Sequence, residues 1–197
     1  MNKLLLLTTA VIAATNAYAL DIRPYVEGKV NYNWLKAEYK DDEDKATFKS
    51  TAAGTSLEVG AKIDQFRVGL EGYYNDKAKK TKVDWAPLEL TTKGVFLNGY
   101  WDSPLGEPKN IKPYIGAGIG YSWLKVTEDL TPLGDGKYSI KDKDWGWNVG
   151  FGVGYEITNN IDLTLGYRYE NLGKIKDEDS KTKFTNHKVS LGLRYTF

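Results

Sequence analysis

The sequence predicts an all-β fold: an eight-stranded antiparallel up-and-down barrel that crosses a membrane. Three observations predict it. Apolar and polar residues alternate with a period of two in eight segments, which is typical of strands with two different faces. The connections between these segments differ sharply in length. Glycine is concentrated on the polar face of the segments, whereas tyrosine and tryptophan gather near the ends of the apolar face.

The eight segments follow one another along the chain, and each has an apolar face and a polar face. We place the strands at residues 22–34, 56–63, 66–73, 95–101, 113–123, 144–156, 161–170 and 188–197. The apolar faces carry, in chain order, Val26 and Val30, Leu57 and Val59, Val68 and Leu70, Val95 and Leu97, Ile115 and Ile119, Val149 and Phe151, Leu163 and Leu165, and Leu191 and Leu193. The opposite faces carry the charged residues and most of the glycines.

The connections predict the orientation of the barrel. Asp64-Gln65 and Thr158-Asn159-Asn160 are short turns, and the connection at 102–110 is somewhat longer. The other four, at about 36–54, 75–90, 124–143 and 171–183, are long. Loops of this length are uncommon in compact soluble domains, whose connections have a median of about 4–6 residues. Short periplasmic turns and four long extracellular loops are typical of outer-membrane barrels.

Alternation alone does not tell whether the apolar face lies inside, as in a soluble ligand-binding barrel, or outside against lipid. Gly116, Gly118, Gly150 and Gly152 crowd the polar face, where they would make room for facing side chains in a narrow lumen. Aromatic residues recur near the strand ends of the apolar face and predict two girdles at the membrane interfaces. The predicted girdle residues are Tyr32, Trp34, Trp101, Tyr121, Trp123, Trp145, Trp147, Tyr155, Tyr167 and Tyr169. We therefore expect the apolar face to contact lipid.

The N-terminal residues have the pattern of a secretory signal peptide. Lys3 provides a positive start, residues 4–14 are apolar, and Ala17-Tyr18-Ala19 is the small-x-small pattern that signal peptidase cleaves. The apolar stretch is too short to span a bilayer. We expect residues 1–19 to be a signal peptide and 20–197 to be the barrel domain of an exported protein.

The composition excludes several classes of protein. The chain has no Cys and a single His, so it has neither a disulfide framework nor the side chains of a typical transition-metal site. Lys and Arg total 27 against 26 Asp and Glu, which leaves no strongly basic surface for nucleic acid. We expect no cofactor, no metal and no nucleic-acid partner.

The polar faces carry cations and anions in nearly equal number. Buried charges are costly unless they are paired, and an eight-stranded barrel is just wide enough for side chains to fill its interior. We predict a mid-barrel ion-pair network that fixes and plugs the lumen, formed by Glu27, Lys29, Glu58, Glu71, Arg168, Lys188 and Arg194. The alternative is a narrow porin-like channel for small solutes lined by the same charges, which steady ohmic openings in planar bilayers would reveal.

Signals of catalysis are weak. A balanced interior network explains the paired carboxylates without an active site. His187 is on the predicted lipid-facing set, and Ser190 is on the opposite face, so the strand forms no catalytic dyad. We interpret His187 as a polar interface residue. A lipid-modifying barrel enzyme is the distant alternative, and unchanged lipid A in a knockout strain would exclude it.

Several segments resemble one known family. They are LNGYWD at 97–102, PYIGAG at 113–118, GVGYEITNN at 152–160 and LGYRY at 165–169. These resemble strands of the small outer-membrane barrels, a family that includes the barrel of outer-membrane protein A and the opacity proteins. The resemblance implies a Gram-negative outer membrane, with lipid and lipopolysaccharide as surroundings, and roles in surface structure, adhesion or antigenicity.

The C-terminal segment resembles the signal that the barrel-assembly machinery reads during biogenesis. Its residues on one face are Leu191, Leu193, Tyr195 and Phe197. In contrast to outer-membrane protein A, no periplasmic peptidoglycan-binding domain follows, so we expect no direct anchoring to the cell wall. The sequence thus predicts a non-enzymatic barrel whose loops contact host or neighbouring-cell surface molecules.

Overall fold

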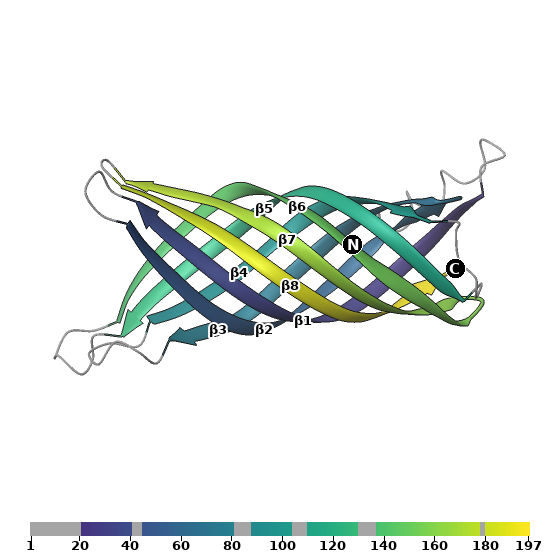
Figure 1. Ribbon diagram of the computed structural model, residues 1–197, viewed down its shortest axis with the longest axis horizontal. Helices are drawn as coiled ribbons and strands as arrows, with labels where there is room; N and C mark the ends of the chain where they lie inside the picture. The colour runs from purple at the N-terminus through teal and green to yellow at the C-terminus, as the bar shows by residue number, and fades with distance from the viewer. Residues whose placement is uncertain (1–20, 41–44, 81–87, 104–109, 130–136, 178–179) are drawn as a thin grey trace, which may run out of the picture.

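The protein is a closed barrel of eight antiparallel strands, as a computed structural model shows (Figure 1). The structure describes residues 21–40, 45–80, 88–103, 110–129, 137–177 and 180–197. The strands are β1 (Ile22–Lys40), β2 (Lys45–Ile63), β3 (Phe66–Lys80), β4 (Leu88–Asp102), β5 (Ile111–Asp129), β6 (Lys137–Thr158), β7 (Ile161–Asp177) and β8 (Ser180–Thr196). Each pairs with the next, and β8 pairs with β1. The predicted fold class is confirmed.

Within the described ranges, no helix is both long enough and apolar enough to cross a membrane. The predicted signal peptide, residues 1–19, lies outside these ranges, so its removal stays a prediction.

The strands extend further at one end than the alternation predicts. Much of the length expected as loop continues the ladder, as in the pairing of Lys36 with Lys49 and of Leu124 with Asp142. The period-two signal ends there because outward residues such as Lys49 and Thr51 are no longer apolar. Backbone pairing continues nevertheless, because the hydrogen bonds between neighbouring strands satisfy the backbone N–H and C=O groups in water as well as in lipid.

The other end of the barrel has the predicted short turns. Asp64 begins a two-residue turn with a φ of 52°, in the left-handed region that tight hairpins use. At the β6–β7 turn, the Thr158 hydroxyl accepts a hydrogen bond from the Ile161 amide at 3.1 Å. Asn160 ties this turn to the chain end, because its side-chain amide donates to the Thr196 carbonyl at 2.7 Å.

The apolar face points outward and the polar face inward. Val68 is 55% exposed and Ile119 is 60% exposed, whereas Glu58 and Asn33 are fully buried. Glycines on the inner face lie beneath large side chains from neighbouring strands. Tyr114, for example, lies over Gly152 and Gly166, where a Cβ atom would be 2.5 Å from its hydroxyl oxygen. Small inner residues thus allow aromatic rings to fill the lumen.

Gly152→Ala is expected to lower the free energy of unfolding by about 1–3 kcal/mol, because the added methyl group displaces Tyr114 and crowds the backbone. Guanidinium unfolding of the barrel from lipid vesicles, followed by tryptophan fluorescence, measures this loss. The matched control is Gly28→Ala, since Gly28 is exposed and has no atom within 4 Å of the added Cβ. Equal stability of the two variants would contradict the proposed close packing.

Candidate functional site

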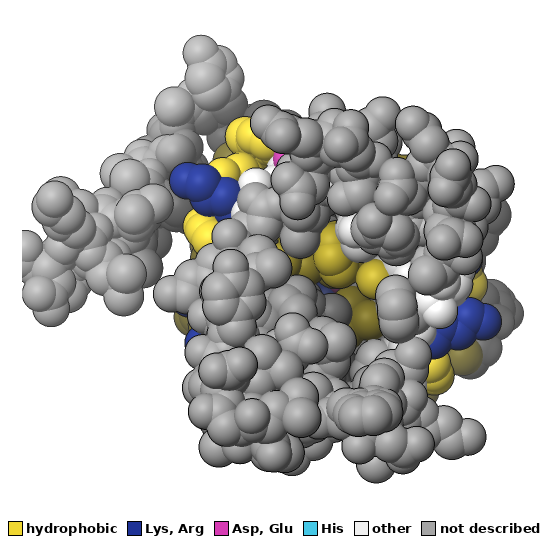
Figure 2. All heavy atoms as spheres, turned by 90° about the vertical axis from the view of Figure 1, so that its left-hand side faces the viewer, with side chains coloured by type: hydrophobic (Ala, Val, Ile, Leu, Met, Phe, Trp, Pro, Cys, Tyr) yellow, Lys and Arg dark blue, Asp and Glu magenta, His cyan; other side chains and the backbone are white. Residues whose placement is uncertain are grey.

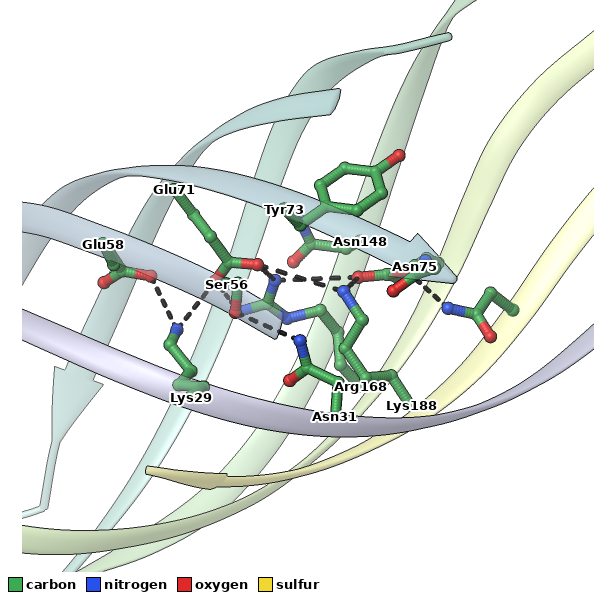
Figure 3. Close-up of polar contacts among 12 residues, drawn as sticks. Lys29, Asn31, Ser56, Glu58, Glu71, Tyr73, Asn75, Asn148, Arg168 and Lys188 are labelled. Carbon is green, nitrogen blue, oxygen red and sulfur yellow. Dashed lines mark hydrogen bonds and ion pairs between the residues drawn. The ribbon is translucent and has the colours of Figure 1, made fainter. Parts of the chain in front are cut away.

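Glu71 lies at the centre of an ion-pair cluster in the middle of the lumen (Figure 3). It projects from β3, and its side chain is 1% exposed. Lys29 on β1 lies 2.7 Å from its Oε2 atom. Arg168 on β7 donates to both carboxylate oxygens, at 2.9 and 3.1 Å. The cluster therefore connects strands on opposite walls of the barrel.

Glu58 and Glu170 extend this cluster in two directions. Glu58 accepts hydrogen bonds from the Tyr25 and Tyr100 hydroxyls, at 2.6 and 2.7 Å, and lies 2.9 Å from the Lys29 ammonium group. Glu170 on β7 accepts a hydrogen bond from Lys188 at 2.6 Å. Of the predicted network, the structure brings together Lys29, Glu58, Glu71, Arg168 and Lys188. Glu170 joins them although the predicted network omits it.

Glu27 and Arg194 lie outside this cluster, nearer to the short turns. They face each other in the β1–β8 register, but Arg194 pairs with Asp162 at 3.2 Å. Glu27 accepts a hydrogen bond from the Thr164 hydroxyl at 2.7 Å. The predicted network is therefore two groups in the structure, one around Glu71 and one that contains Glu27 and Arg194.

Arg67 joins this second group, since its Nη1 atom lies 4.0 Å from a carboxylate oxygen of Glu27, and it pairs with Asp102. Nε of Arg67 lies 2.9 Å from both carboxylate oxygens of Asp102, and Nη2 lies 2.8 Å from one of them. Lys62 adds a contact to Asp102 at 3.3 Å. Sequence reasoning missed Asp102 because it begins a connection between two predicted strands. The alternation of Asn98, Tyr100 and Asp102 on one face is the signal that could have found it.

An apolar cluster closes the lumen on the side of the long connections. Its members, all at most 5% exposed, are Leu35, Ala52, Tyr73, Phe96, Leu124, Leu172 and Phe184. Figure 2 views the barrel from this end and shows hydrophobic side chains in its centre. Sequence reasoning assigned several of these residues to loops. Leu35 nevertheless continues the inner face of Asn31 and Asn33, which would have revealed it in a longer strand.

Little space remains between the clusters. A cavity of about 30 Å³ is lined by Glu27, Lys29, Arg67 and Arg168 among others. This volume holds about two or three water molecules, since one water needs about 10–15 Å³ of such space. No group of three or more metal-ligating side chains occurs among the described residues.

The predicted girdle residues lie on the outer face in two groups. Toward the long connections are Tyr32, Trp34, Tyr121, Trp123, Trp145, Trp147, Tyr167 and Tyr169, whereas Trp101 and Tyr155 lie near the short turns. In the first group, ring centroids of Trp147 and Tyr169 are 5.7 Å apart. His187 packs at 5.2 Å from Tyr169.

The spacing of the two groups matches a membrane. His187 on β8 packs beside Tyr169 of the first group, and Phe197, which directly follows β8 at the end of the short turns, is ten residues further along the chain. With a rise of about 3.3 Å per residue and a tilt of about 45°, this separation is roughly 23 Å along the barrel axis. The apolar band of such barrels is about 25 Å tall.

The C-terminal residues with the predicted assembly role all face outward. Leu191, Leu193, Tyr195 and Phe197 are 42–66% exposed. The Tyr195 and Phe197 rings meet edge to face with centroids 4.9 Å apart. The Phe197 amide donates to the Pro24 carbonyl at 2.9 Å, so pairing with β1 reaches the last residue.

Comparison with known proteins agrees with this geometry. A family model described as "Outer membrane protein beta-barrel domain" matches residues 4–197. Outer membrane protein P.IIC of Neisseria gonorrhoeae is 26% identical over 215 residues, which cover 94% of this chain and 77% of that protein. Outer membrane protein PagN of Salmonella typhimurium is 31% identical over 125 residues, covering 56% of this chain. The chain spans about half the length of PagN, since the match covers 51% of it.

Solved structures share the fold. Neisserial surface protein A has a TM-score of 0.59 and 22% sequence identity, with 88% of this chain and 97% of that chain covered. A major outer membrane protein from Thermus thermophilus has a TM-score of 0.57 and 12% identity, with 90% and 100% covered. The family resemblance expected from the sequence is confirmed. The chain belongs to the outer-membrane β-barrel domain family and is a protein of the outer membrane.

Proposed function

We propose that this protein is a non-enzymatic, non-conducting scaffold that presents its hairpins at the cell surface for contact with host or neighbouring-cell molecules. The observation that carries the proposal is the filled lumen. Successive layers of ion pairs and apolar side chains occupy it, with Glu71 and Phe96 at 1% and 0% exposure. A barrel filled in this way does not favour solute passage, so the exposed hairpins are the surface left for function.

The extended strands support this role. Beyond the aromatic girdle, β1 and β2 pair without interruption as far as Lys40 and Lys45. Their outward residues there are polar, including Lys36, Glu38 and Lys49. Such a continuous ladder carries the paired ends of β1 and β2 beyond the aromatic girdle. Adhesion is the role that the resemblance to opacity proteins implies.

We also propose roles for the two outward-facing sets. The aromatic groups anchor the barrel at the two interfaces, because tyrosine and tryptophan prefer the boundary between hydrocarbon and water. The C-terminal residues Leu191, Leu193, Tyr195 and Phe197 would be the segment that the barrel-assembly machinery recognises during biogenesis.

The test trims the surface hairpins while keeping the register of the barrel. Each tip is replaced by Asn-Gly between directly paired residues, a sequence that favours two-residue hairpin turns. The replaced segments are 38–47, 76–91, 127–139 and 174–183, which lie between register partners. Adherence of bacteria expressing the trimmed barrel to cultured epithelial cells is expected to fall to the level of cells without the protein.

The matched control places Asn-Gly at Asp64-Gln65, the turn at the opposite end. This variant is expected to keep full adherence. Electrophoretic mobility before and after heating shows that both variants are folded. If the trimmed barrel is folded and adherence survives, the hairpins do not carry the function and the proposal is wrong.

A further inference from the structure

The ladder that closes the barrel is interrupted at two places on the side of the long connections. β2 and β3 pair only as far as Gly54 and Asn75, although β2 begins at residue 45 and β3 continues to residue 80. β6 and β7 likewise pair only as far as Trp147 and Asn171. Beyond these positions the strands form two four-stranded sheets, β7-β8-β1-β2 and β3-β4-β5-β6, whose ends are parted at the left of Figure 1.

A β-bulge lies beside each interruption. Relative to its other neighbour, β3 carries one extra residue between Asn75 and Ala78, and β7 carries one between Asn171 and Gly173. Bulges bend a strand and increase its twist, so each bulge turns its strand away from the neighbouring sheet.

The two interruptions differ in what occupies them. At the β6–β7 interruption, a Cβ atom on Gly173 would lie 2.5 Å from the Cβ atom of Asp144, so the protein's own side chain lies there. At the β2–β3 interruption, the outward side chains of Thr47, Lys49 and Thr51 on β2 are exposed. We call residues 45–53 of β2 the free edge, because β3 does not pair with them.

The free edge presents backbone groups that have no strand partner. The Tyr74 carbonyl oxygen would lie 2.8 Å from a Cβ atom on Gly54, so it points toward β2, where Thr55 is its register partner. In an antiparallel sheet, alternate residues direct their N–H and C=O groups at alternate neighbours. Thr51, Lys49 and Thr47 therefore direct theirs, as Thr55 does, to the side of β3. Within the described part of the chain, no strand pairs with these three residues on that side.

The charge beside the interruption selects the kind of strand that could pair with the free edge. Residues 45–53 of β2 and 76–80 of β3 carry five lysines and one acidic residue, namely Lys45, Lys49, Lys77, Lys79 and Lys80 against Asp76. Antiparallel pairing of two copies about Thr47 would place Lys45 of one copy opposite Lys49 of the other, and like charges directly opposite each other are destabilising. An acidic strand, in contrast, is attracted by the same lysines.

The inner side of the free edge is apolar. Ala52 belongs to the apolar cluster, and Phe48 is the register partner of Ala37, which packs against that cluster. Side chains of an added strand would alternate between this apolar side and the outward side that carries Lys49.

We propose that the free edge of β2 binds an extended peptide segment as an additional strand, with acidic side chains outward and small apolar side chains inward. The main-chain hydrogen bonds supply affinity, and the alternating side chains supply specificity. The proposal rests on the surface function proposed above and deepens it, because it names the chemistry of the partner. At about 3.3 Å per residue, the nine residues 45–53 offer roughly 30 Å of edge.

The experiment titrates a capped peptide of alternating Glu and Val into the full barrel domain held in phosphatidylcholine nanodiscs. Calorimetry measures the affinity, and hydrogen exchange is expected to show new protection of the Thr47, Lys49 and Thr51 amides. Paired residues on one face share their hydrogen bonds, so the Glu residues would direct their N–H groups at β2. N-methylation of the Glu residues is therefore expected to abolish binding, and N-methylation of the Val residues to leave it unchanged. A peptide of alternating Lys and Val is expected to bind at least tenfold more weakly.

The protein variants remove donors from the free edge. T47P/T51P deletes two edge N–H groups, which proline permits where the N–H faces away from the neighbouring strand. At about fivefold for each lost hydrogen bond, it is expected to bind the acidic peptide roughly 25-fold more weakly. The matched control T47V/T51V keeps both N–H groups and is expected to bind as the wild type does. D41N/D42N/E43Q/D44N neutralises the neighbouring acidic residues without changing the edge, and it is expected to bind at least as tightly.

Equal affinity of T47P/T51P and T47V/T51V, or of the two N-methylated peptides, would overturn the proposal, as would equal binding of the lysine peptide. Electrophoretic mobility before and after heating shows that each variant is folded. Because peptide affinity is measured on the purified barrel, it fails separately from the surface function. Adherence that is lost on hairpin trimming, together with no binding of the acidic peptide, would contradict strand addition alone. Peptide binding together with adherence that survives trimming would contradict the surface function alone.

Discussion

Glu71→Ala is expected to lower the free energy of unfolding by about 3–5 kcal/mol, the usual effect of removing one partner from a buried ion pair. Arg168 is the cation that loses the most contacts in this variant. It loses both of its hydrogen bonds to Glu71, and its remaining ion-pair partner, Glu170, is 3.7 Å away. Lys29 retains Glu58 and Lys188 retains Glu170, so the loss falls mainly on one guanidinium group.

Guanidinium titration of the barrel in lipid vesicles measures the change, with the tryptophans as the fluorescent probe. The control is Glu156→Ala, an inward-facing glutamate near the short turns whose pair with Lys112 is about 30% exposed. Exposed pairs contribute about 0–1 kcal/mol, so this variant should unfold almost as the wild type does. Glu71→Gln separates charge from shape, and it should destabilise nearly as much as Glu71→Ala. Losses below about 1 kcal/mol in both Glu71 variants would show that the cluster does not stabilise the barrel.

The strands and their faces could be predicted from the sequence because the membrane demands a strict pattern. Each outward residue between the girdles contacts lipid, so Val68, Leu70 and Leu97 recur with a period of two. Beyond the girdle that demand ends. Lys49 and Thr51 on β2 face outward as Leu57 does. Both are polar, however, and polar residues of this kind occur in strands and in loops alike. The pairing of the strands in this region therefore emerges only from the three-dimensional ladder.

Which charged side chains contact one another depends on distances across the lumen. The alternation of apolar and polar residues along a strand gives no information on these distances. Glu71 on β3 contacts Lys29 on β1 and Arg168 on β7, and neither strand is adjacent to β3. The sequence predicts that these side chains share the interior. It does not contain the stagger of the strands, which places Glu27 and Arg194 nearer to the short turns than Glu71.

Phe96→Ala is expected to lower the free energy of unfolding by about 3–5 kcal/mol, because Phe96 has no exposed surface and its removal leaves a cavity. Its ring stacks on Tyr73 with centroids 5.7 Å apart, and it lies over Gly120. Phe96→Leu keeps most of the apolar volume and should cost less than about 1.5 kcal/mol. The same unfolding titration measures both variants. Equal losses would mean that apolar volume alone does not replace the aromatic ring, contrary to this expectation.

Planar-bilayer recording of Phe96→Ala adds a second readout, because the apolar cluster and the ion-pair cluster lie in series along the lumen. A hydrophobic constriction excludes ions by dewetting, and removing the ring weakens that barrier. Glu71, Lys29 and Arg168 still fill the next layer, so the variant is expected to show no steady openings despite its lower stability. Ohmic openings in Phe96→Ala but not in the wild type would show that the apolar cluster alone seals the barrel. Openings in the wild type would support the narrow channel instead, since neither layer would then be closed.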